Sequence, residues 1–201
     1  MKRFAWFAFC VLAVYAMPLP AQEKESKEAA QSMSPPKPLQ DDLCAWMVGE
    51  WEGFSVSPMG KTKDWQKVEW GLDGQFVVTT YSSTTVEMTE EQKKKAMETW
   101  GMSKEDVENM MNMAYKGMGP MTINPATGEF VGYWFDNWRG MYKGSGKREG
   151  NRVTMSWEGP MGTEVRTTEK TGDDTMVVTF KSMDPKGNPM EGRTELKRKK
   201  M

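Results

Sequence analysis

Apolar and polar residues alternate along most of the chain from residue 49 onward. Val153, Met155 and Trp157, for example, alternate with Thr154 and Ser156, which is the period-two pattern of a strand that buries one face. The alternation predicts ten strands, at 49–57, 62–72, 75–86, 118–124, 129–138, 141–147, 152–158, 163–170, 175–183 and 190–198. Short strands separated by frequent turn signals are typical of an antiparallel sandwich or barrel.

One internal segment departs from this alternation. Residues 89–116 contain few strand-forming residues and carry two pairs, Thr89 with Gln92 and Ser103 with Asp106, that match the capping box at the start of a helix. A glycine separates the two helical stretches. The segment is therefore expected to be a helical hairpin inserted between the third and fourth strands.

A short amphipathic helix is predicted just before the first strand. Leu39, Leu43, Trp46 and Met47 recur at helical spacing, so their apolar side chains would share one face of the helix. This helix would lead directly into the first strand.

The N-terminal segment 1–21 has the features of a signal peptide. Lys2 and Arg3 precede an apolar run at 4–17, which is shorter than the ~20 residues needed to cross a bilayer, and Ala21 is a small residue suited to cleavage. We predict cleavage near Ala21, export to the periplasm or the extracellular space, and no transmembrane span in the mature chain.

The stretch 22–38 is rich in Glu, Lys, Ser and Pro. Such a composition cannot bury enough apolar surface to order itself, so this stretch is predicted to be a disordered leader. The folded domain is then expected to span 39–201, with the helical insertion inside it.

Composition narrows the chemistry that the chain can perform. It has 201 residues, with 27 Lys and Arg against 28 Asp and Glu, and therefore lacks the basic excess expected of a nucleic-acid-binding protein. It contains no His, which excludes a histidine-based triad and haem ligation by His. Cys44 is the one cysteine beyond the signal peptide, and its apolar neighbours predict a small buried residue rather than a reactive thiol.

Gly49-Glu50-Trp51, which opens the first predicted strand, resembles the Gly-x-Trp motif of the lipocalins and their calycin relatives. In those barrels the Trp packs at the closed base, near an Arg of the last strand. Arg198 is the matching residue in this sequence. The resemblance implies a structural barrel base that includes Gly49, Trp51 and Arg198.

A wider set of motifs resembles a secreted bacterial family, the domain of unknown function 1579. The motifs are Gly49-Glu50-Trp51-Glu52-Gly53, Gly74-Gln75-Phe76 and Gly128-Glu129-Phe130-Val131-Gly132-Tyr133-Trp134-Phe135-Asp136. The resemblance implies a mainly β fold, an up-and-down calycin-like barrel of about ten strands, and an exported location. It implies no activity, because none is established for the family. The related nitrobindins bind haem through a His, which this chain lacks.

Methionine is expected to fill much of the core. The chain has 20 Met, whereas four Leu and one Ile follow residue 21. Pro-Met occurs four times, always in odd-numbered connections between the predicted strands, which lie at one end of an up-and-down barrel. These dipeptides predict a Met-rich mouth that contains Met59, Met121, Met161 and Met190. The helical insertion should cover this mouth as a lid, and Trp51 and Arg198 should lie at the opposite end.

Three interpretations of the Met-rich mouth remain open. Met can replace Leu in packing the lid onto the barrel. It can also form a pliable entrance for a small apolar or amphipathic molecule, since a barrel of this size can hold one such ligand. Thioethers can finally bind Cu(I), and several methionines lie close together in sequence: Met110, Met111, Met113, Met118 and Met121.

Inward-facing positions of the predicted strands give a candidate ligand pocket. Its predicted residues are Tyr81, Trp134, Asp136, Met155 and Arg166. Trp134 and Asp136 share one face of a strand, and the resemblance aligns them with a recurring feature of the family. A structural ion pair of Asp136 with Arg166 or Arg193 is the alternative.

These features together predict an exported, non-enzymatic protein that binds a small apolar or amphipathic ligand in a lidded barrel, with no resident cofactor. One alternative is an interaction module that docks a partner protein or an envelope surface through the Met-rich mouth. A further alternative is Cu(I) binding by thioethers. An enzyme that uses a carboxylate in the cavity ranks last, because no spacing selects a catalytic pair.

Overall fold

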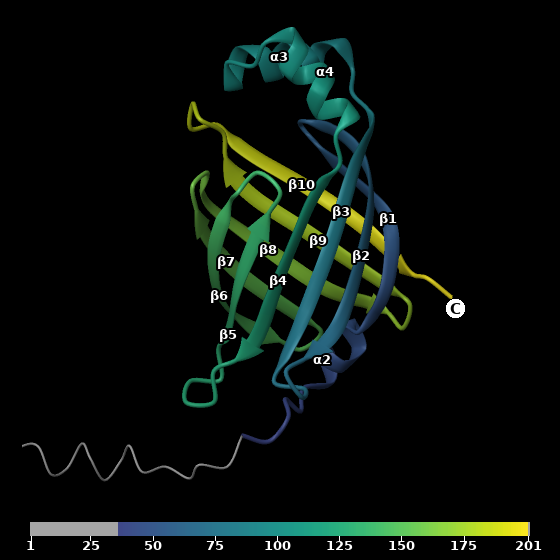
Figure 1. The fold of residues 1–201 in the computed structure, drawn as a ribbon, viewed down its shortest axis with the longest axis vertical. Helices are drawn as coiled ribbons and strands as arrows, with labels where there is room; N and C mark the ends of the chain where they lie inside the picture. Colours follow the sequence, from purple (N-terminus) through teal and green to yellow (C-terminus); the bar gives the residue numbers. More distant parts are fainter. Residues whose placement is uncertain (1–35, 201) are drawn as a thin grey trace, which may run out of the picture. The chain divides into compact units, whose positions relative to one another are not determined.

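The period-two segments form ten antiparallel strands that close into an up-and-down barrel (Figure 1). The strands are β1 (Gly49–Ser57), β2 (Gly60–Gly71), β3 (Phe76–Glu87), β4 (Tyr115–Ile123), β5 (Phe130–Asp136), β6 (Met141–Glu149), β7 (Arg152–Gly159), β8 (Gly162–Gly172), β9 (Thr175–Met183) and β10 (Pro189–Arg198). Each strand pairs with its neighbours in sequence, and β10 pairs with β1 to complete the ring. The predicted fold class is confirmed.

This computed structural model describes residues 36–200. The predicted signal peptide at 1–21 and most of the leader at 22–38 lie outside the described residues. Within residues 36–200, three helices accompany the strands: α2 (Asp42–Met47), α3 (Glu90–Trp100) and α4 (Lys104–Asn112). In the described part of the chain, none of the helices has the length and apolar character required to cross a bilayer.

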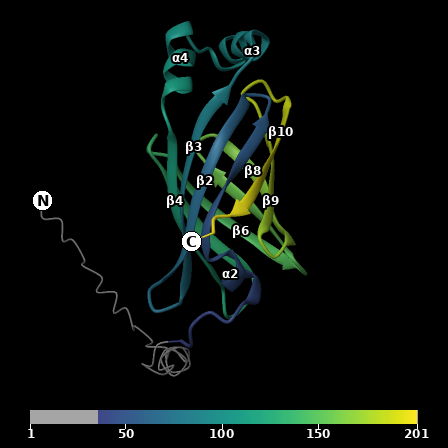
Figure 2. The same cartoon turned by 90° about the vertical axis from the view of Figure 1, so that its right-hand side faces the viewer.

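The helices lie at opposite ends of the barrel (Figure 2). α2 lies against the end where β1 begins and β10 ends, which we call the base. α3 and α4 connect β3 to β4 and lie over the other end, which we call the mouth. The expected arrangement of one helix before β1 and a helical hairpin between the third and fourth strands is therefore present.

Trp51 and Arg198 join the first and last strands of the barrel at the base. The Trp51 side chain is fully buried, and its indole Nε1 donates to the carbonyl oxygen of Met47 at 2.8 Å. The Arg198 guanidinium lies 4.2 Å from the centre of the Trp51 ring, within the range of a cation–π contact. Gly49 has a φ of 140°, and a Cβ there would lie 2.6 Å from Nη1 of Arg198, so glycine leaves room for the guanidinium.

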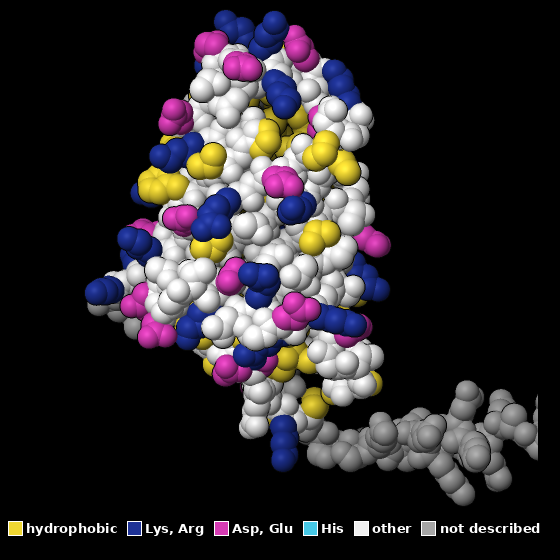
Figure 3. All heavy atoms as spheres, turned by 180° about the vertical axis from the view of Figure 1, so that it is seen from behind, with side chains coloured by type: hydrophobic (Ala, Val, Ile, Leu, Met, Phe, Trp, Pro, Cys, Tyr) yellow, Lys and Arg dark blue, Asp and Glu magenta, His cyan; other side chains and the backbone are white. Residues whose placement is uncertain are grey.

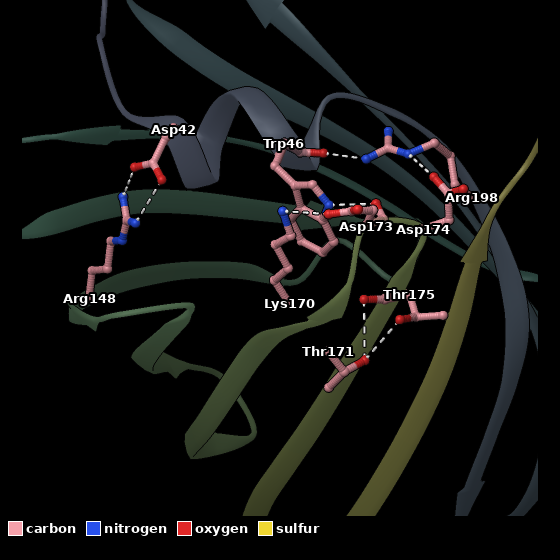
Figure 4. A network of polar contacts seen from close by, with 9 residues as sticks. All are labelled: Asp42, Trp46, Arg148, Lys170, Thr171, Asp173, Asp174, Thr175 and Arg198. Atoms are coloured by element: carbon pink, nitrogen blue, oxygen red, sulfur yellow. Dashed lines mark hydrogen bonds and ion pairs between the residues drawn. The ribbon is translucent and has the colours of Figure 1, made fainter.

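Polar contacts fasten α2 to the base (Figure 4). Arg198 donates to the carbonyl oxygens of Trp46 and Val48 at 2.7 and 2.8 Å, and so provides partners for carbonyls at the C-terminal end of the helix, which have none within it. Near the other end of the helix, Arg148 of β6 donates to the carboxylate of Asp42 at 2.5 and 3.2 Å. This contact lowers the pKa of Asp42 below its usual value.

Cys44 of α2 faces the core and is fully buried. Burial raises the pKa of its thiol to about 12, with a smaller contribution from Asp41. A thiol with this pKa stays protonated in the folded protein at neutral pH, whereas the thiolate is the form that reacts with disulfides.

We therefore expect Cys44 to resist a disulfide reagent at pH ~8 until the protein unfolds. The measurement is the rate at which the reagent's thiol is released by the Cys10→Ser protein. The same protein with Cys44→Ala added is the unreactive control. The folded state keeps the Cys44 thiol neutral. The free energy of unfolding should therefore fall as pH rises from about 9 to about 12, because the unfolded thiol ionises first. Fast labelling of the native protein would contradict the buried position.

The lid has a hydrophobic cluster of its own. Both predicted capping boxes are present, at Thr89 with Gln92 and at Ser103 with Asp106. Met88, Ala96 and Val107 are buried between the helices and the mouth, and further methionines pack against them: Met59, Met97, Met102, Met110 and Met111. Much of the methionine at this end therefore packs the lid, as the first interpretation of the Met-rich mouth predicts.

One of the four Pro-Met dipeptides does not lie at the mouth. Strand β4 starts at Tyr115 rather than at the predicted residue 118. Pro120 and Met121 lie well inside it, opposite Val78 and Val77 of β3, and not in the connection between β3 and β4. Met121 packs against the core cluster at the base, and its predicted place in the Met-rich mouth is wrong. Proline lacks an amide N–H, and the β4–β5 ladder is interrupted at Pro120 while its register continues on both sides. The other three dipeptides lie at the mouth, in the β1–β2 and β7–β8 turns and at the start of β10.

Candidate functional site

The barrel encloses a cavity of about 400 Å³. Its lining extends from Met47 of α2 at the base to Trp100 of α3 and Met161 of the β7–β8 turn at the mouth. Most lining residues occupy inward positions of the strands, which alternate with the outward positions. In Figure 3, hydrophobic side chains are visible in the hollow between the lid and the barrel wall. The cavity is large enough for a small organic molecule.

The part of the cavity nearest the base is apolar. Its wall contains five core residues from four strands: Val68, Val153, Met155, Met176 and Leu196. These side chains are almost fully buried, and together with Trp51 they fill the base of the barrel. This end of the cavity offers contacts suited to a hydrocarbon group and few polar atoms.

Aromatic rings from three strands line the middle of the cavity. The ring centres of Tyr115 and Trp134 lie 6.0 and 6.3 Å from that of Tyr81, within the range of edge-to-face packing. Trp134 Nε1 donates to the Tyr115 hydroxyl at 2.9 Å. The Trp134 ring lies over Gly117 of β4, where a Cβ would come within 2.3 Å of the ring. Glycine at this position therefore lets the ring lie flat against the wall.

Arg166 of β8 places a positive charge inside the barrel. Its Nε and Nη2 contact Oε1 of Glu164 at 2.8 and 2.7 Å. Burial is the largest influence and opposes the charged form of Arg166, but Glu164 together with Tyr81 and Tyr115 raises the pKa of the guanidinium above its usual value. The side chain is 42% exposed, although Arg166 lines the cavity. That exposed surface includes the part that faces the cavity.

The two phenols beside Arg166 are neutral hydrogen-bonding groups near pH 7. Burial is the largest cause that raises the pKa of Tyr81, followed by the charge of Asp64. Burial also raises the pKa of Tyr115, to about 12. Together with the Arg166–Glu164 pair, these hydroxyls supply the few polar groups that fix orientation in a ligand pocket.

Four of the five predicted pocket residues line the cavity: Tyr81, Trp134, Met155 and Arg166. Asp136 does not line it, so its predicted place in the cavity wall is wrong, and its Oδ2 accepts a hydrogen bond from the Tyr115 hydroxyl at 3.4 Å. Its Oδ1 accepts hydrogen bonds from the backbone N–H groups of Trp138 and Gly140 at 2.9 and 2.7 Å. The carboxylate therefore shapes the β5–β6 turn, and the alternative ion pair with Arg166 or Arg193 is not formed either.

The methionines predicted for the mouth are divided between two environments. Met161 and Met190 line the cavity, whereas Met59 packs against the lid cluster. The five methionines considered for Cu(I) are likewise separated, because Met110 and Met111 belong to the lid and Met121 to the base. Within residues 36–200, no three His, Cys, Asp or Glu side chains are grouped as they would be around a metal ion.

Glu164 and Tyr115 are among the pocket residues that the sequence-based prediction lacks. Glu164 lies two positions before Arg166 on β8, and the period-two rule places both on the inner face. The sequence pattern includes Tyr115 in the helical insertion, but this residue opens β4 and points inward. The alternation along β8 is therefore enough to predict that Glu164 faces inward. The position of Tyr115 can be predicted only if the end of the helical insertion is known.

A buried carboxylate is also absent from that prediction. Asp64 of β2 is completely buried and accepts hydrogen bonds from the hydroxyls of Thr62 and Ser83 at 2.6 and 2.8 Å. Ser55 of β1 donates to its other oxygen and also contacts Thr194 of β10. This network connects four strands of the barrel wall next to the cavity, which gives Asp64 a structural role.

No family model and no curated protein matches the chain. Among solved structures, the crystal structure of Rv2717c from M. tuberculosis is similar with a TM-score of 0.52 and 12% sequence identity, over 81% of this chain and 99% of that chain. A redesigned β-barrel has a TM-score of 0.41 and 7% identity, over 81% of this chain and 99% of its own. A de novo designed fluorescence-activating β-barrel has a TM-score of 0.39 and 11% identity, over 80% of this chain and 100% of its own. The likeness to Rv2717c concerns the fold alone.

Proposed function

We propose that the barrel binds a small amphipathic molecule, with its apolar part toward the base and its polar part beside Arg166, Glu164 and Tyr81. The observation that carries this proposal is one continuous cavity of about 400 Å³ whose wall changes from aliphatic and thioether groups at the base to hydroxyls and an ion pair farther up. An apolar ligand alone would leave the charged pair facing hydrocarbon, which is costly.

Binding fits these groups better than catalysis does. The chain has no His, and the raised pKa values of Tyr81 and Tyr115 make both phenols poor sources of phenolate near pH 7. Glu164 is engaged by Arg166, so its carboxylate is held in an ion pair. The predicted signal peptide supports an exported location for this binding function, and membership of the domain of unknown function 1579 family remains part of the proposal.

The direct test is a fluorescence titration with anilinonaphthalene sulfonate, an aromatic amphiphile with a sulfonate group. We expect saturable binding of one probe, followed by displacement with long-chain carboxylates, alcohols and amines. Arg166→Met combined with Glu164→Gln should lower the affinity for the probe by about tenfold or more, because a hydrogen bond to a charged group contributes about 1.5–3 kcal/mol. The double variant avoids leaving Glu164 unpaired.

Arg152→Met with Glu169→Gln is the matched control. These residues form the corresponding ion pair between β7 and β8 on the outside of the barrel, at 3.0 Å, and their removal should leave probe affinity unchanged. A probe signal that rises without saturation, or equal losses in both double variants, would count against a ligand site in the cavity.

A further inference from the structure

The outer face of β4, β5 and β6 has a cluster of exposed apolar side chains near the mouth. Met118, Phe135 and Met141 are direct neighbours across the three strands, and their exposed fractions are 51%, 43% and 67%. Trp138, in the turn that follows β5, is 62% exposed, and Tyr133 of β5 is 51% exposed. We call these five residues the rim patch. Such a group of large apolar side chains on a protein surface marks an interaction site.

Three basic residues surround the rim patch. Lys116 of β4, Arg139 of the β5–β6 turn and Lys143 of β6 are all exposed, and none of the three forms an ion pair within residues 36–200. Both carboxylate oxygens of Asp136 have partners, because Oδ1 accepts from the backbone of its own turn and Oδ2 from the Tyr115 hydroxyl. Glu158 of β7 lies opposite Lys143 in the register and is the acidic residue that faces this group. The patch therefore combines apolar side chains with a net positive charge.

Other hairpins at the same end of the barrel expose apolar side chains as well. Met161, in the β7–β8 turn, is 64% exposed, and Met183, at the end of β9, is 60% exposed. Both also line the mouth of the cavity. These two residues lie on other hairpins than the rim patch, at the end of the barrel that the lid covers, and are not part of the patch.

We propose that the rim patch docks the outer face of β4, β5 and β6 on an anionic lipid surface. Trp and Tyr prefer the boundary between water and hydrocarbon, because one part of each side chain is apolar and the other polar. Lys and Arg next to such a boundary are attracted to anionic headgroups. This charge complementarity favours lipid over a second copy of the chain, since two copies of the same basic patch would repel each other.

The test is flotation of the full chain with vesicles of phosphatidylcholine alone and of phosphatidylcholine mixed with phosphatidylglycerol. We expect binding to the anionic vesicles and its loss at about 0.5 M salt, where charge attraction is screened within a few Å. Lys116→Gln with Lys143→Gln should weaken this binding by about fivefold for each cation removed. Trp138→Ser with Met141→Ser should weaken it by at least about tenfold.

Trp70→Ser with Leu72→Ser is the matched control, because these exposed residues lie at the opposite end of the barrel. It should keep the vesicle affinity of the unchanged chain, and all variants should keep their binding of anilinonaphthalene sulfonate. Equal losses in the mouth and base variants, or no binding to anionic vesicles, would overturn the proposal. So would a stable dimer in sedimentation velocity that Trp138→Ser with Met141→Ser disrupts, because the patch would then be covered by a second copy.

Discussion

Replacing Trp51 by alanine is expected to lower the free energy of unfolding by about 3–5 kcal/mol, the usual cost of truncating a large buried aromatic residue. The indole is fully buried at the base, donates to Met47, and forms the surface on which Arg198 lies. Its removal would leave a cavity and also take away the support of the guanidinium. Urea unfolding followed by far-UV circular dichroism measures the change.

Trp70→Ala provides the comparison within the same barrel. Trp70 is 39% exposed, so its truncation should cost clearly less than that of Trp51. Arg198→Lys is a second, milder test, because a lysine ammonium cannot reach the carbonyls of Trp46 and Val48 with the forked geometry of arginine. If Trp51→Ala lowered the free energy of unfolding no more than Trp70→Ala does, the contacts of Trp51 at the base could not be a main source of the barrel's stability.

The second large effect concerns the cavity itself. Thr79 of β3 lines the cavity, and Thr79→Trp would place an indole in the space that we assign to the ligand. We expect binding of anilinonaphthalene sulfonate to fall by about a hundredfold or become undetectable, because the probe and the indole cannot occupy the same volume, and overpacking costs the fold about 1–3 kcal/mol. Calorimetric titration measures the affinity and the stoichiometry.

Thr80→Trp is the matched control for this variant. Thr80 is the next residue on the same strand and faces solvent, so the same substitution there adds an indole outside the barrel. It should leave probe binding unchanged. Because Thr79→Trp acts by filling space, a folded Thr79→Trp protein that binds the probe normally would place the ligand site outside the cavity.

Most of the fold is predictable from the sequence because the period-two signal is repeated so often. The alternation around Val153, Met155 and Trp157 coincides with β7, and the capping boxes at Thr89 and Ser103 mark the starts of α3 and α4. A strand that buries one face needs this alternation, and a helix start needs a partner for its free amides. Both requirements act over a few residues and are therefore visible locally.

The errors arise where a residue serves a role that its local sequence does not show. Proline usually marks a turn, but Pro120 lies within β4, and this moves Met121 from the mouth to the base. Asp136 lies on the inner face of its strand, yet the turn that follows uses its carboxylate. The direct partners of Asp64 lie on β1, β2 and β3, and their roles depend on the register of these strands, which the local sequence does not show. Thr194 of β10 joins the network through Ser55 only because the barrel closes.

Closure of the sheet between β1 and β10 has a consequence for how fast the chain can fold. Arg198 and Val48, which are hydrogen-bonded at the base, lie 150 positions apart, and the β1–β10 ladder joins equally distant segments. Contacts this far apart require a large loss of chain entropy before they form, whereas the other ladders join strands that are neighbours in sequence, so closure is the slow pairing of this barrel. Until β10 is in place, β1 and β9 each keep an unpaired edge that can pair with another chain. The interval before closure is thus the period in which this protein is most exposed to aggregation.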